Sequence, residues 1–238
     1  SEKELLEEIE KRAEEVLREH DKRSEEIKRE LERVLKELRD LSRKIEEDLE
    51  RLVREVTDLE ELVRRLVEIA RRASKIIEDV VRKLAKLLRE ASEVIKKTVD
   101  KLVRLLEEAV RLLREGNTEE ERVRDLERLV EEIVRRLEEI VRKHRELVRR
   151  IVERLREIVE EHKRIVEEVV KTLERLVENR VDKKDIERIV RELIKVHRDV
   201  LRKLEKVVRE ALELHDRVNK ELREVVERAL RLLREVTR

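Results

Sequence analysis

Hydrophobic residues recur along almost the whole chain at alternating steps of three and four positions, as at Leu31, Val34 and Leu38. An α-helix has 3.6 residues per turn, so this spacing gathers them into one apolar stripe along a helix. The pattern breaks at three places. The sequence therefore predicts four long helices, covering 2–56, 59–115, 119–178 and 183–236.

Residues that commonly begin or end helices occur at the chain's start and at the breaks. Ser1 and Thr118 are each followed three positions later by Glu, the spacing of a capping box. Asp58 and Asp182 are typical N-cap residues. Gly116, the only glycine, is expected in the left-handed conformation that ends many helices, and Asn179 tolerates the same conformation. The predicted caps are Ser1, Asp58, Gly116, Thr118 and Asp182.

The three predicted loops are short, and short loops force consecutive helices to run antiparallel. Each helix has one apolar face, and a bundle of four buries all four faces together. We therefore predict an all-α fold, an up-down-up-down four-helix bundle in which residues 1–238 form a single domain. An eighteen-residue repeat at 127–162 spans about five turns, which matches a straight helix and predicts little supercoiling.

Each apolar stripe also contains two polar residues that lie eighteen positions apart. Antiparallel neighbours pair by height, so the spacing from the predicted loops places these residues in two cross-sections. The predicted first layer is Ser24, Ser92, His144 and His215. The predicted second layer is Ser42, Ser74, His162 and His197. Small neighbours, Ala73 and Ala91, leave room for imidazole rings, and an additional end layer is predicted at His20, Thr98 and Asn219.

A buried imidazole or hydroxyl without a partner costs about 1–3 kcal/mol, so residues at one height are expected to bond to one another. Neutral His and Ser can each donate and accept, which allows a closed ring within a layer. The interpretation we favour is structural: the layers penalise misaligned helices and so specify register and pairing. We predict no catalytic residues and no metal ligands.

Three other interpretations of the layers remain open. Two histidines per layer could bind zinc or haem, although no carboxylate or thiolate joins them and the flanking residues are bulky. A Ser–His pair could act as nucleophile and base, but it would lack an orienting carboxylate and a cleft. Burial disfavours imidazolium, so protonation would loosen the bundle and make the chain responsive to acid.

Composition narrows the range of functions. Charged residues make up 53% of the chain, yet 64 Lys and Arg nearly balance 63 Asp and Glu. A nucleic-acid-binding protein would show a basic face, and this chain has alternating charges and no aromatic residue. The absence of Cys excludes disulfides and thiolate metal sites. No apolar run approaches the length of a membrane span, and the first residues do not resemble a signal peptide.

The chain resembles de novo designed helical bundles with buried hydrogen-bond networks, and is especially similar to designed helical-hairpin heterodimers. The resemblance rests on the Glu/Arg/Lys surface, the Leu/Ile/Val core, the predicted caps and the repeated polar layers. It covers the whole chain, although here both hairpins belong to one polypeptide. It implies a scaffold whose networks give pairing specificity, with no enzymatic activity, no cofactor and no natural biochemical role.

From these features we expect a monomer that needs no partner, with a dimer formed by exchange of helical hairpins as the alternative. We expect neither nucleic-acid nor membrane binding. The chain is predicted to be soluble and suited to recombinant cytoplasmic expression. A binding or switch module, responsive to pH or to a His-coordinated ion, is the alternative to a purely structural role.

Overall fold

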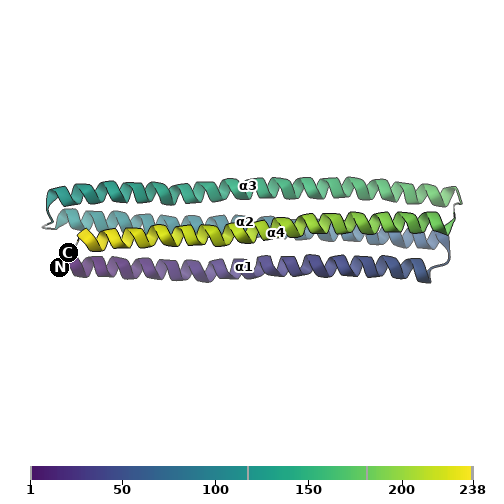
Figure 1. Ribbon diagram of the computed structural model, residues 1–238, viewed down its shortest axis with the longest axis horizontal. Helices are drawn as coiled ribbons and strands as arrows, with labels where there is room; N and C mark the ends of the chain where they lie inside the picture. Colours follow the sequence, from purple (N-terminus) through teal and green to yellow (C-terminus); the bar gives the residue numbers. More distant parts are fainter. Residues whose placement is uncertain (1, 117, 181, 237–238) are drawn as a thin grey trace. The chain divides into compact units, whose positions relative to one another are not determined.

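A computed structural model describes residues 2–116, 118–180 and 182–236, and the described residues contain four helices and no strand. The helices are α1 (Glu2–Glu55), α2 (Leu59–Glu115), α3 (Glu120–Glu178) and α4 (Lys183–Val236) (Figure 1). The predicted all-α four-helix bundle is confirmed. Only the end of α1 and the start of α3 differ from the predicted bounds, by one residue each.

The chain divides into two compact units, and each unit contains a segment of every helix. Unit 1 comprises Ser1–Arg29, Leu88–Arg149 and Leu212–Arg238. Unit 2 comprises Glu30–Leu87 and Arg150–Ala211. The predicted first layer and end layer belong to unit 1, whereas the predicted second layer belongs to unit 2. That the whole chain acts as one domain stays a prediction.

Surface ion pairs identify the neighbouring helices within unit 1. Arg12 of α1 lies 3.1 Å from Glu108 of α2, and Glu19 lies 3.6 Å from Lys101. Residue numbers rise along α1 while those of their partners fall along α2, so the two segments run antiparallel. Such exposed pairs contribute only about 0–1 kcal/mol each, so they report the arrangement of the helices more than they stabilise it.

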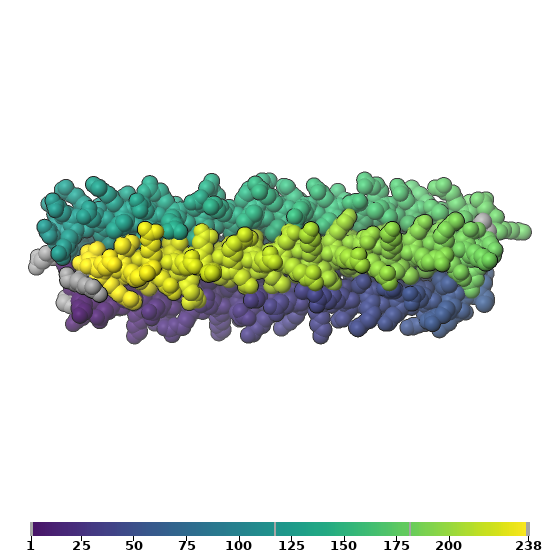
Figure 2. All heavy atoms as spheres, viewed as in Figure 1, coloured from purple at the N-terminus to yellow at the C-terminus, as the bar shows by residue number. Residues whose placement is uncertain are grey.

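In unit 2, α2 and α3 are joined by the pair Glu78–Lys163, at 2.9 Å, and α1 and α4 by Arg39–Glu205, at 3.7 Å. Within each unit, α4 packs beside both α1 and α3 in the space-filling view (Figure 2). Each helix therefore has two direct neighbours in the order α1, α2, α3, α4 and back to α1. None of the described helices is apolar enough over a sufficient length to cross a membrane.

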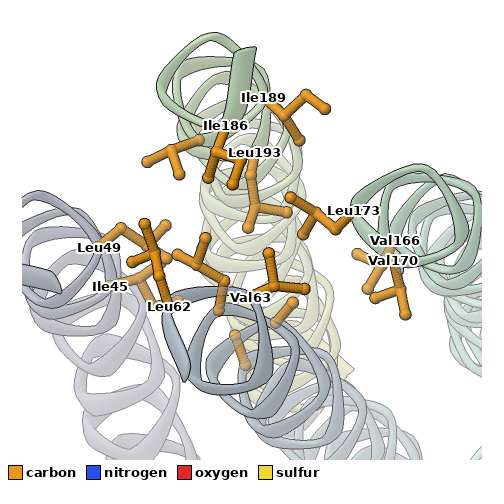
Figure 3. Close-up of a cluster of buried hydrophobic side chains, with 14 of the residues drawn as sticks. Ile45, Leu49, Leu62, Val63, Val166, Val170, Leu173, Ile186, Ile189 and Leu193 are labelled. Atoms are coloured by element: carbon orange, nitrogen blue, oxygen red, sulfur yellow. The ribbon is translucent and has the colours of Figure 1, made fainter. Parts of the chain in front are cut away.

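The apolar stripes of all four helices meet in the core of unit 2 (Figure 3). Leu49, Leu62, Leu173 and Leu193 come from different helices, and each has no exposed surface. Burying one such leucine side chain stabilises the fold by about 1.5–3 kcal/mol. The hydrophobic residues of the cluster are Ile45, Leu49, Val56, Leu62, Val63, Leu66, Ala70, Ala73, Val166, Val170, Leu173, Ile186, Ile189, Val190 and Leu193.

The helix ends agree with some of the predicted caps. The carbonyl of Asp58 accepts the first bond of α2, from the Leu62 amide at 2.9 Å, which is the N-cap position. The carbonyl of Asp182 accepts from the Asp185 amide at 3.0 Å, just before α4. Ser1 lies outside the described residues.

At the start of α3 the structure differs from the prediction. The helix begins at Glu120, and its first bond runs from the Val123 amide to the Glu119 carbonyl, at 3.1 Å. The hydroxyl of Thr118 donates to the carboxylate of Glu2, so its bond connects α1 to the segment that precedes α3.

The left-handed residue was predicted at the wrong positions. Gly116 has no positive φ, because its amide continues the helical pattern by donating to the Leu112 carbonyl at 3.2 Å. At the third break the left-handed residue is Arg180, with φ of 51°, and not Asn179. The Asn179 amide still bonds to the Arg175 carbonyl, at 3.1 Å, so the left-handed residue follows one position later than expected.

We predict that Leu173→Ala lowers the free energy of unfolding by about 2–5 kcal/mol, because it leaves a cavity among side chains from all four helices. Urea unfolding followed by circular dichroism measures this loss. Leu147→Ala makes the same change on the same helix at a position that is 37% exposed, and should cost less than about 1 kcal/mol. Equal losses for the two variants would contradict the described core.

Candidate functional site

A continuous chain of hydrogen bonds crosses the interior of unit 1, and we refer to it as the unit 1 network. His20 Nδ1 lies 2.8 Å from Thr98 Oγ1, and His20 Nε2 lies 2.8 Å from Asn219 Oδ1. Asn219 Nδ2 donates to Ser24 Oγ at 2.5 Å. Ser24 Oγ lies 2.7 Å from His215 Nε2, which is also 2.9 Å from the Ser24 carbonyl oxygen. The network thus joins α1, α2 and α4.

The amide of Asn219 fixes the direction of most of these bonds. Its oxygen only accepts, so His20 Nε2 must carry a proton and donate to it. The neutral ring of His20 then accepts at Nδ1 from the Thr98 hydroxyl. A carbonyl oxygen also only accepts, so His215 Nε2 carries a proton towards Ser24. With both histidines neutral, each contact in the network has a donor and an acceptor, and the single N–H of His215 Nε2 is shared between the hydroxyl and carbonyl oxygens of Ser24.

The four residues of the predicted first layer form two separate hydrogen-bonded pairs. Ser24 bonds to His215 across α1 and α4, and Ser92 Oγ bonds to His144 Nδ1 across α2 and α3, at 2.7 Å in each case. No bond between the pairs is found among the described residues, so the closed ring that a single layer allows does not form. Instead Asn219 links Ser24 to the end layer, which was predicted separately.

The predicted second layer, in unit 2, has a different arrangement. His162 and His197 face each other from α3 and α4, with ring centroids 5.1 Å apart and ring planes at 82°. His197 Nδ1 donates to the Leu193 carbonyl at 2.8 Å, one turn earlier on the same helix. Ser42 and Ser74 are only half-buried, and neither makes a hydrogen bond within the described part of the chain.

Both facing histidines have a nitrogen without a partner. His162 Nε2 and His197 Nε2 are buried, and within 2–116, 118–180 and 182–236 neither contacts a donor or an acceptor at bonding distance. The eighteen-residue repeat did not reveal this difference from unit 1. Positions equivalent to His20 and Asn219 are Leu38 and Leu201, both buried, so unit 2 lacks the side chains that complete the network.

Burial lowers the pKa of all five histidines. It lowers the pKa of His144 to about 4, with a smaller contribution from the nearby His215. It lowers the pKa of His162 to about 4 as well, and there the second contribution comes from His197. Burial is also the main cause of the lowered pKa at the other three, which are His20, His197 and His215. The neutral form is therefore stabilised at neutral pH.

Both Ser–His pairs of unit 1 are buried. Two Ser–His pairs lie within bonding distance, but each Ser and each His in them is at most 6% exposed, so a substrate has no access. No group of three or more His, Cys, Asp or Glu side chains suited to a metal occurs in the described residues. The hydrogen bonds of His144 and His215 in the described residues run to Ser92 and Ser24, and none of them runs to a carboxylate.

The sequence was compared with protein-family models and with curated proteins, and neither comparison gives a match.

We predict that Ser24→Ala lowers the free energy of unfolding by about 1–3 kcal/mol, because Asn219 Nδ2 then loses its acceptor inside unit 1. Denaturant titration at pH 7.5 measures the loss. Ser42→Ala, on the same helix, removes a half-buried hydroxyl for which the described residues offer no partner, and should change stability by less than about 0.5 kcal/mol. A loss at Ser42 as large as that at Ser24 would argue against the network.

We predict that acid destabilises the fold through His162. Its pKa falls from 6.5 to about 4 on folding, so below pH 6.5 the unfolded chain takes up a proton that the folded chain does not. The resulting loss grows as the pH falls towards 4 and reaches about 3 kcal/mol. It is absent above pH 6.5, where the residue is neutral in both states.

Urea midpoints between pH 7.5 and 5 measure this loss before most surface carboxylates titrate. In His162→Leu the decrease over this range should be smaller than in the unaltered chain. An identical decrease in both proteins would show that His162 does not remain neutral in the folded state.

Proposed function

We propose that the chain is a structural scaffold of designed origin, in which buried polar networks specify which helices pair and in what register. The observation that carries this proposal is the unit 1 network, which joins three helices through one continuous set of hydrogen bonds. A stripe of Leu and Val alone tolerates sliding, because one apolar contact replaces another. Directional hydrogen bonds oppose sliding, because they break when the donor and the acceptor move apart.

The cost of a wrong alignment supports this role. If α4 slid by one turn, either His215 or Asn219, depending on the direction, would lose its partner and face an apolar stretch of α1, near Ile27 or Leu17. Each buried group that lost its partner would cost about 1–3 kcal/mol. Exposed ion pairs contribute only about 0–1 kcal/mol each, and Lys or Arg can reach an alternative Glu one turn away. The network therefore discriminates between registers more strongly than the surface charges do.

A role without catalysis is consistent with the burial of the Ser–His pairs. The proposal includes no cofactor, no nucleic-acid partner and no membrane partner. We propose a monomer as the principal state. An exchange dimer, in which the hairpin of α1 and α2 pairs with the α3 and α4 hairpin of a second copy, would satisfy the same networks and is the alternative assembly.

One observation favours a second function, a module that responds to acid. All five histidines are buried and neutral, and two of them face each other in unit 2. Protonating both rings of that pair would place like charges together in an apolar core, which is unfavourable. The scaffold would then loosen as the pH falls. The two functions are compatible, because the same side chains would specify register when they are neutral.

We predict that an apolar replacement of the unit 1 network keeps the helices but loses the single register. The variant combines His20→Leu, Ser24→Ala, Thr98→Val, His215→Leu and Asn219→Leu. Replacing both partners of a buried bond by apolar groups is often neutral or stabilising, so the variant should still fold. The absence of directional bonds should allow α1 and α4 to adopt several alignments.

Spin labels at the exposed positions Lys22 and Lys220, introduced as Cys, report the alignment of α1 and α4 in the full chain. The chain has no Cys of its own, so labelling is specific. Double electron–electron resonance should give one narrow distance distribution with the network and a broader one without it. The matched control, Lys28→Gln with Arg223→Gln, removes two surface ion pairs between α1 and α4 and should keep the narrow distribution. A narrow distribution in the apolar variant would show that packing alone sets the register.

A further inference from the structure

The histidine pair of unit 2 contains the two buried side-chain atoms that have no hydrogen-bond partner among the described residues. His162 is 3% exposed and His197 is 2% exposed, yet the Nε2 atom of each lacks a partner among the described residues. Leaving such an atom unsatisfied in an apolar core costs about 1–3 kcal/mol. Two of them occur on rings that face each other from α3 and α4. This combination is the arrangement of a ligand site rather than of a completed network.

The hydrogen bond that His197 makes through Nδ1 leaves the lone pair of its Nε2 atom available to bind a cation. Its Nδ1–H donates to the Leu193 carbonyl at 2.8 Å, so the lone pair of the neutral ring lies on Nε2. Metal-binding histidines usually donate the other ring N–H to a carbonyl or a carboxylate in this way, which fixes the ring and its tautomer. Leu193 itself is fully buried in the core cluster, so the carbonyl that orients the ring is held by packing.

The separation of the two rings fits a shared ion. Two imidazoles bound through Nε2 at about 2.0 Å have centroids about 5 Å apart when the angle at the ion is about 110–120°, and roughly 6 Å apart when it is linear. The observed centroid separation is 5.1 Å. The separation is therefore compatible with a bent pair of ligands in a three-coordinate site, in which a hydroxyl or a water takes the third position. Ser42 and Ser74 are predicted at this height.

The charge of the surroundings decides which kind of ion fits. Both ligands are neutral, and the described residues provide no third His, Cys, Asp or Glu for a metal site. Burying a cation without a counter-charge is costly, and the cost rises with the square of the charge. Zinc also prefers four ligands, often with anionic ones among them. Imidazole nitrogens are suitable ligands for copper. A univalent ion carries half the charge of Zn²⁺, so burying it without a counter-charge costs less.

We propose that His162 Nε2 and His197 Nε2 form a binding site for a univalent copper-group ion, Cu(I) or its analogue Ag(I). Binding would satisfy both unpaired nitrogens and would break no hydrogen bond of the protein, since the bond from His197 to Leu193 remains. The site goes beyond the proposed scaffold role and does not depend on it. The alternative occupant is a single water that bridges the two rings.

The unit 1 histidines are an internal control within the same chain. Both ring nitrogens of His20 are bonded, and the bonding nitrogens of His144 and His215 are held by Ser92 and Ser24. An ion in unit 1 would have to displace these bonds. His144→Leu is therefore the matched control for His162→Leu and His197→Leu, because it removes an equally buried ring from the same bundle.

Titration of the full chain with Ag(I), followed by calorimetry, should give one equivalent bound per chain and a raised melting temperature, since a ligand of the folded state stabilises it. His162→Leu and His197→Leu should each lose that equivalent, whereas His144→Leu should keep it. Circular dichroism confirms that each variant is folded. In the unaltered chain, the imidazole ¹⁵N signals of His162 and His197 should shift together on saturation, and those of His20 should not.

Cu(I), added under anaerobic conditions with a competing chelator, should be retained by the unaltered chain, and X-ray absorption should show two imidazole nitrogens on the copper. Absence of uptake for both univalent ions, with an unchanged melting temperature, would overturn the proposal and leave a bridging water as the occupant. Equal uptake by His197→Leu would place the ion elsewhere and also overturn it. Tighter retention of Zn²⁺ than of Cu(I) would overturn the assignment of a univalent ion. None of these outcomes bears on register, which the spin-label distances test separately.

Discussion

The requirement that a buried polar atom has a hydrogen-bond partner determines how the interior of this protein is organised. The apolar stripes provide most of the stabilising free energy, but they are similar along every helix and specify little about alignment. Polar atoms placed among them carry a penalty for each missing partner. Unit 1 avoids that penalty by extending its bonds over three helices, with Asn219 connecting two groups of residues that the sequence spacing had separated.

The sequence spacing assigned Ser24 and His215 to one height, and Ser92 and His144 likewise, and the structure joins both pairs by hydrogen bonds. This works because height depends only on residue number and loop position. The spacing predicted the partners less well. Each helix has two neighbours, and small rotations about the helix axis decide which neighbour a side chain bonds to. The residue spacing does not encode these rotations. Ser24 therefore pairs with His215 and Ser92 with His144, where a closed ring of four was the expectation. Gly116 and Arg180 show the same limit at helix ends: composition predicted where the breaks occur but not which residue takes the left-handed conformation.

The two units contain the same repeated set of two Ser and two His, yet only unit 1 completes its bonds. The difference comes from the flanking residues, since His20 and Asn219 have leucines as their counterparts in unit 2. With fewer polar side chains available, the serines of unit 2 are half-exposed and the imidazoles face each other without donors or acceptors. A short repeat thus predicts equivalent positions, while the neighbours of the repeat decide their chemistry.

This difference separates the contributions of the two units. A satisfied network opposes sliding, because every displaced helix would lose bonds that it already has. An unsatisfied pair gives little opposition to sliding, because the nitrogens of His162 and His197 have no bonds to lose. Such a pair instead offers nitrogen lone pairs at fixed positions in a buried site. A ligand that bonds to these nitrogens removes the free-energy cost of leaving them without a partner, and this favours its binding. In the roles that we propose, unit 1 would therefore set the register and unit 2 would bind the small ligand.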